Sequence, residues 1–164
     1  FEQVGAFMGT WVIAYGIVQG SAPGLRRLWG QTTSPGVSAV QFWSALLTAI
    51  PALIGVALWR DANVAVAITA GLAAFGVVFA MNSSIHSYMV LAYTDAESVS
   101  LNVGFYYMAN AAGRLVGTLL SGAVFMLGRT ASGGMQACLW CSSLLVMLAW
   151  LSSLRLPAPL RTAS

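Results

Sequence analysis

The sequence predicts an all-α, polytopic membrane protein with five transmembrane helices. Of its 164 residues, 59% are hydrophobic and only 7% are charged, whereas ordinary soluble domains contain about 25% charged residues. The chain contains five apolar stretches of about the length that a helix needs to cross a bilayer, roughly 20 residues. Helices are indicated because lipid offers backbone groups no other partner, and the alternation with period two that marks a β-barrel is absent.

The five expected spans are separated by short connections. They cover about residues 4–22, 37–59, 64–93, 99–127 and 134–156. The first ends before the Pro23-Gly24 pair, which is typical of a loop. The second contains Pro51, which predicts a kink, and the turn of residues 60–63 follows it.

The third span contains a polar turn around His86, but neither Gly nor Pro stops the helix before about Tyr93. The fourth begins just after the acidic residues Asp95 and Glu97, which favour a helix N-terminus. A glycine-containing loop, residues 128–133, leads into the fifth. Residues 157–164 form a short tail, and no soluble domain is expected.

The arginines predict how the helices cross the membrane. All seven basic residues are Arg. With five crossings, Arg26, Arg27, Arg155 and Arg161 share one side, and Arg60 and Arg129 share the other. Because cytoplasmic loops carry an excess of positive charge, the 23–36 loop and the C-terminus are expected in the cytoplasm, with the chain in the cell inner (plasma) membrane. No longer basic run exists to bind nucleic acid.

The fourth span carries a polar stripe formed by Tyr107, Asn110 and Arg114, which helical spacing places on one side. An ionised arginine at mid-bilayer costs at least roughly 2.5 kcal/mol. Arg114 is therefore expected either to bind an anionic ligand or to gate a pathway; the alternative is that it snorkels or pairs with a carboxylate. Gly113, Gly117 and Ser121 follow a small-xxx-small pattern that predicts close packing of another helix.

In the third span, Asn82 and His86 lie one turn apart. A histidine titrates near neutral pH and can couple solute movement to protons; the alternative is a hydrogen bond between helices. His86 is the only histidine, so a site with several histidine ligands is excluded, and neither a metal nor a cofactor is expected.

No enzyme is predicted. Cys138 and Cys141 match the CxxC redox spacing, but a second cysteine pair that would pass electrons onward is missing, which favours a packing role. Ser121 with His86 lacks the glycine that precedes the nucleophile in a hydrolase motif.

Two segments carry a resemblance to a known family: MNSSIHSYMVLAY at 81–93 and VSLNVGFYYMANAAGRLVGTLLSG at 99–122. They resemble the C-terminal half of a major facilitator superfamily permease, and more narrowly the ArsJ-type organoarsenical efflux permeases. Residues 11–27 and 137–140 also resemble this family. The resemblance implies that the five spans correspond to helices 8 to 12 of a twelve-helix transporter, as a partial C-terminal bundle whose N-terminal half is missing.

The resemblance implies export of 1-arseno-3-phosphoglycerate, which forms when glyceraldehyde-3-phosphate dehydrogenase uses arsenate in place of phosphate. The exported anion falls apart outside the cell, which gives arsenate resistance. Arg114 is the expected anion-binding residue, and Asn82, His86, Tyr107 and Asn110 are expected to supply hydrogen bonds or proton coupling. The alternatives are a superfamily exporter of another small solute or drug and, further away, a membrane redox or scaffold protein.

Overall fold

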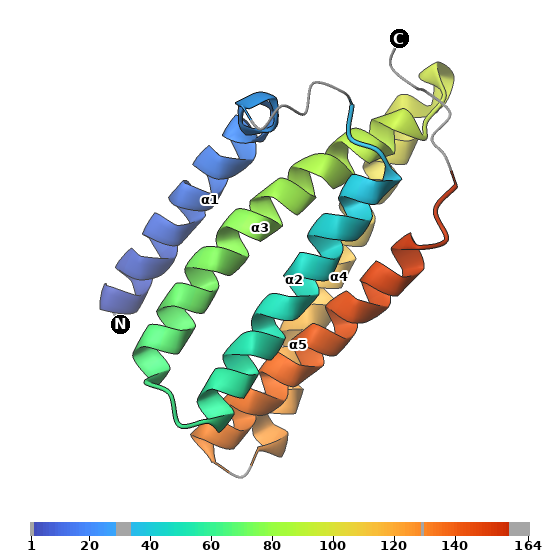
Figure 1. The fold of residues 1–164 in the computed structure, drawn as a ribbon. Helices are drawn as coiled ribbons and strands as arrows, with labels where there is room; N and C mark the ends of the chain where they lie inside the picture. The colour runs from blue at the N-terminus through green and yellow to red at the C-terminus, as the bar shows by residue number, and fades with distance from the viewer. Residues whose placement is uncertain (1, 29–33, 129, 158–164) are drawn as a thin grey trace.

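A computed structural model of the chain describes residues 2–28, 34–128 and 130–157. All regular structure in these ranges is helical, which confirms the predicted all-α class (Figure 1). The helices are α1 (Glu2–Leu28), α2 (Val37–Trp59), α3 (Val64–Ala92), the short 3-10 helix η1 (Ala96–Ser98), α4 (Val99–Leu127) and α5 (Ala131–Ser153). Arg129, Arg161 and most of the 157–164 tail, all used in the predictions above, lie outside the described residues.

Within the described ranges, four helices are long and apolar enough to cross a membrane: α2, α3, α4 and α5. These helices are compatible with a multi-pass membrane protein. Although α1 has 27 residues, it begins with the polar Glu2 and Gln3 and contains five glycines, which add little apolar surface. A crossing by α1, and so the count of five spans, stays a prediction.

Helix ends follow local capping chemistry. The side chain of Asn63 accepts a hydrogen bond from the Val66 amide at the start of α3. The Thr130 hydroxyl accepts one from the Gly133 amide, at 3.1 Å, at the start of α5. Such caps satisfy amides that have no partner within the helix.

Helix α1 continues beyond the expected end at Ala22 and includes Pro23.

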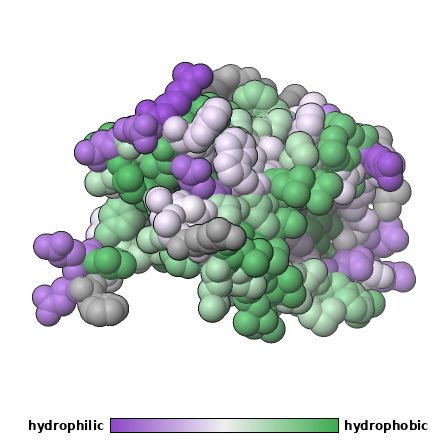
Figure 2. Space-filling model, turned by 90° about the horizontal axis from the view of Figure 1, so that it is seen from below, coloured by the Kyte–Doolittle hydropathy of each residue, from purple (hydrophilic) through white to green (hydrophobic). Residues whose placement is uncertain are grey.

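Consecutive helices run in opposite directions (Figure 1). In the order α1, α3, α2, α5, each helix packs against the next, while α4 lies behind them and packs on α5 and, over fewer residues, on α3. The α2–α3 turn and the α4–α5 hairpin therefore meet at the same end of the bundle. Seen from that end, most of the surface is hydrophobic or of intermediate hydropathy, and hydrophilic residues form separate groups mainly near its edge (Figure 2).

The core lies on α2, the inner helix. Its buried side chains recur every three or four residues, as one face of a helix requires. They are Val40, Ser44, Leu47, Ile50, Pro51, Ile54 and Leu58. On α3, Val78, Ile85 and Met89 pack against this face.

Glycines let the packed helices approach each other. A Cβ at Gly76 of α3 would lie 3.0 Å from Trp11 Nε1 of α1, and this indole donates to the Leu72 carbonyl at 2.8 Å. A Cβ at Gly55 of α2 would lie 3.3 Å from the Trp140 ring of α5. Aromatic rings thus occupy the space that a side chain would need.

Helix α4 differs from the others because none of its 29 residues is buried. At the hairpin between α4 and α5, a Cβ at Gly128 would clash with the Gly134 backbone, and a Cβ at Gly134 would clash with the Phe125 carbonyl oxygen. Along the helix, the Cys138 thiol donates to the Ser121 carbonyl at 3.4 Å. Most of the α4 surface is therefore open.

Candidate solute-binding groove

A groove of about 270 Å³, lined by both polar and apolar side chains, lies between α3 and α4. Its lining residues are Phe79, Asn82, Ser83 and His86 from α3 and Tyr106, Ala109 and Asn110 from α4. The structure thus brings together three residues that the sequence predicted for the site, namely Asn82, His86 and Asn110. We call this space the α3–α4 groove.

Asn82 is fixed by the neighbouring helix. The side chain is 9% exposed, and its Oδ1 accepts a hydrogen bond from Ser44 Oγ of α2 at 3.2 Å. Since the amide oxygen is turned toward α2, the N–H donors of the same amide are left for the groove. Asn82 therefore offers donors to a ligand.

The orientation of His86 follows from a bond to its own helix. Its Nδ1 lies 2.9 Å from the Asn82 backbone carbonyl oxygen. A carbonyl oxygen only accepts, so Nδ1 carries the hydrogen, and Nε2 is the acceptor of the neutral ring. The half-buried imidazole thus keeps one ring nitrogen that can accept a hydrogen bond.

Ser83 links the groove to α1. Its Oγ accepts a hydrogen bond from Gln19 Nε2 at 3.4 Å, which leaves the hydroxyl hydrogen to donate. Two helices therefore position the α3 wall of the groove: α2 through Asn82 and α1 through Ser83.

On α4, Tyr106 lines the groove and Tyr107 does not. Tyr107 is 61% exposed, and its ring meets only the Tyr106 ring, with centroids 5.4 Å apart, among the described residues. Residues four apart diverge less around a helix than residues three apart. Tyr106, four residues before Asn110, therefore lies closer to the side of α4 that carries Asn110. The four-residue spacing in the sequence could have identified it as the groove residue.

Arg114 lies one turn beyond Asn110 on α4 and outside the groove lining. It is exposed, and its guanidinium makes no hydrogen bond or ion pair with the described part of the chain. The acidic residues Glu2, Asp61, Asp95 and Glu97 all lie at helix ends or in turns. A partner carboxylate for Arg114 is therefore not supplied by the interior of any described helix.

The predicted packing residues of α4 behave differently from one another. A Cβ at Gly113 or Gly117 would meet nothing within 4 Å, so no described helix uses them for close packing. Ser121 faces α5, where a cavity of about 100 Å³ also touches Gly117, Cys138 and Cys141. Both cysteines are free thiols.

Within the described ranges, no three or more His, Cys, Asp or Glu side chains group as metal ligands would. Comparisons with protein-family models, with curated proteins and with solved structures find no match for this chain.

Proposed function

We propose that this chain is part of a membrane efflux transporter for an organoarsenical anion, 1-arseno-3-phosphoglycerate. The observation that carries the proposal is the α3–α4 groove, where Asn82, Ser83, His86 and Asn110 lie between two helices that are apolar enough to cross a membrane. Polar and ionisable groups at membrane depth are expensive and are typical of solute pathways. The identity of the solute comes from the family resemblance.

The groove suits an acceptor-rich solute. Asn82 and Ser83 direct donors into it, and Asn110 adds a second amide with no hydrogen-bond partner among the described residues. Phosphate, arsenate and carboxylate oxygens are acceptors only. His86 Nε2 is an acceptor in the neutral ring, and we assign His86 a role in proton coupling.

Arg114 would provide the positive charge. An exposed guanidinium on an apolar helix must lie in water or pair with an anion, because lipid cannot solvate it. Its position one turn from Asn110 places it where a solute leaving the groove along α4 would meet it. Tyr107, on the same side of α4, would lie along this route.

The open surface of α4 would pack against further transmembrane helices, which in the resembled family form the N-terminal half. Gly113, next to Arg114, leaves room for a helix backbone. Alternating access would then come from rocking of the two halves around the groove.

The proposed location is the cell inner (plasma) membrane, with the C-terminus in the cytoplasm, where glyceraldehyde-3-phosphate dehydrogenase would generate the solute.

The test is Arg114→Ala in the full transporter, expressed in arsenate-sensitive cells. We expect loss of arsenate resistance and at least about a tenfold drop in organoarsenical export into inverted vesicles, since an unpaired charge on the pathway is removed. Arg155→Ala is the matched control, because Arg155 is exposed beyond the end of α5. Full resistance in Arg114→Ala cells, at equal protein levels in the membrane, would overturn the proposal.

The second candidate, a transporter of the same family for another small solute or drug, uses the same groove. Competition in inverted vesicles separates the two: a neutral drug that displaces the organoarsenical anion at lower concentration favours the second. A redox protein is the more distant alternative. It requires the two thiols, so unchanged function after joint Cys138→Ser and Cys141→Ser substitution would remove it.

A further inference from the structure

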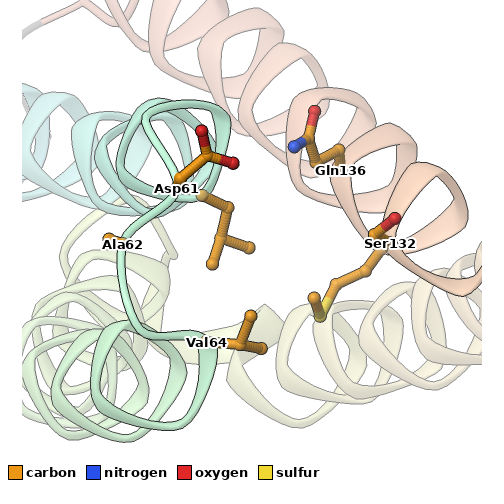
Figure 3. A pocket seen from close by; sticks show the side chains of 7 residues that line it. Asp61, Ala62, Val64, Ser132 and Gln136 are labelled. Atoms are coloured by element: carbon orange, nitrogen blue, oxygen red, sulfur yellow. The ribbon is translucent and has the colours of Figure 1, made fainter.

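A second cavity, of about 330 Å³, lies at the end of the bundle where the α2–α3 turn meets the start of α5. It is lined by Leu58, Asp61, Ala62, Val64, Ser132, Met135 and Gln136 (Figure 3). The turn forms one wall, and Ser132 and Gln136, one helical turn apart on α5, form the other. We call this space the turn cavity; it shares no residue with the α3–α4 groove.

The lining of the turn cavity is amphipathic. Asp61, Ser132 and Gln136 contribute polar groups from both walls (Figure 3), while Leu58, Val64 and Met135 contribute apolar surface. Asp61 is the only charged side chain among the lining residues. A fitting ligand therefore has a cationic, hydrogen-bonding head and an adjoining apolar part.

The backbone of Asp61 is unusual. Its φ is 59°, the only positive value at a non-glycine residue in the described part of the chain. Glycine adopts this left-handed conformation at the least cost, although Asp and Asn tolerate it better than most residues. The chain thus keeps a carboxylate where glycine would be less strained. The exposed Arg60 directly precedes it in the chain.

We propose that the turn cavity binds the headgroup of a zwitterionic phospholipid with a primary ammonium, of the phosphatidylethanolamine type. The ammonium would donate to the Asp61 carboxylate and to the Gln136 and Ser132 side-chain oxygens. Arg60 would pair with the phosphate, and the glycerol end of the acyl chains would lie along Leu58 and Met135. The cavity is located where α2 ends and α3 and α5 begin, which is the depth of lipid headgroups.

Pairing with an exposed carboxylate is weak in water. A lipid, however, is confined to the bilayer at a high local concentration, so that weak pairing is enough to enrich one headgroup around the protein. This inference does not depend on the proposed transport of an anion.

The test uses the full chain, reconstituted into nanodiscs with equal parts of phosphatidylethanolamine, phosphatidylcholine and phosphatidylglycerol. Mass spectrometry then quantifies the lipids that stay with the protein after extraction in mild detergent. We expect phosphatidylethanolamine to be enriched, and Asp61→Asn to lower this enrichment about fivefold, as the loss of one exposed ion pair allows. Asn keeps the shape and tolerates the positive φ. Asp95→Asn, outside the cavity, is the matched control and should change nothing.

Equal enrichment in Asp61→Asn and unaltered protein would overturn the proposal. So would equal retention of phosphatidylcholine, whose quaternary ammonium cannot donate a hydrogen bond. If soluble phosphoethanolamine displaces the lipid at millimolar concentration, the ligand is a free headgroup-like solute and the lipid assignment is wrong. Gln136→Leu provides a second variant if Asp61→Asn fails to fold, and we expect it to lower the enrichment as well.

Discussion

Helices α3 and α4 have the same length, 29 residues, and both are apolar enough to cross a membrane. Each also carries an asparagine that lines the α3–α4 groove. Yet α3 has eight buried residues and α4 has none. A polar residue in an apolar helix can therefore stabilise the fold or be available to a ligand. Which of the two applies depends on whether a neighbouring helix bonds to its side chain.

Two polar groups of α3 are held by neighbouring helices while they keep donors for the groove. Asn82 is bonded to Ser44 of α2, and Ser83 is bonded to Gln19 of α1. On α4, Asn110 and Arg114 have no such partner among the described residues. We therefore regard α3 as the rigid wall of the groove and α4 as the wall whose groups are free to bind.

The largest effect on stability is expected for Asn82→Leu. The substitution leaves the buried Ser44 hydroxyl without its acceptor, which costs about 2 kcal/mol of the free energy of unfolding. Asn110→Leu, the matched change on α4, should stay within about 0.5 kcal/mol because that side chain is exposed. Thermal unfolding in detergent measures both.

Equal losses of stability for Asn82→Leu and Asn110→Leu would contradict the comparison, since α4 would then contribute to the fold as α3 does. Transport should show a different pattern. If Asn110 binds solute, Asn110→Leu lowers export while leaving the unfolding midpoint unchanged.

A smaller effect on stability is expected when Gly76 of α3 or Gly113 of α4 is replaced by alanine. In Gly76→Ala the new methyl group would lie 3.0 Å from Trp11 Nε1, so the indole must shift and weaken its bond to the Leu72 carbonyl. We expect a net loss of about 1 kcal/mol. Gly113→Ala meets open space and gains up to about 1 kcal/mol from helix propensity. The two unfolding midpoints should therefore move in opposite directions, and a shared direction would show that Gly113 is packed.

The sequence alone predicted the features that depend on local chemistry. Long apolar runs predicted the helices, and the four-residue spacing of Asn82 and His86 placed them on one side of α3. The sequence did not reveal that Ser44, 38 residues away, donates a hydrogen bond to Asn82, because that pairing depends on how α2 and α3 pack. Likewise, the sequence pointed to Tyr107 where the groove contains Tyr106, and to a seam at Gly113 that no described helix fills.

The smallest effect should come from the contact between α4 and α5. The Cys138 thiol donates to the Ser121 carbonyl at 3.4 Å, but a thiol is a weak donor. Cys138→Ala is therefore expected to cost no more than about 0.5 kcal/mol, measured by the same unfolding assay with Cys141→Ala as control. A cost several times larger would mean that this seam, rather than the glycine hairpin at residues 128–134, holds α4 in place. In that case the contact between Cys138 and Ser121 would hold α4 to α5, and α4 would contribute to the fold as α3 does.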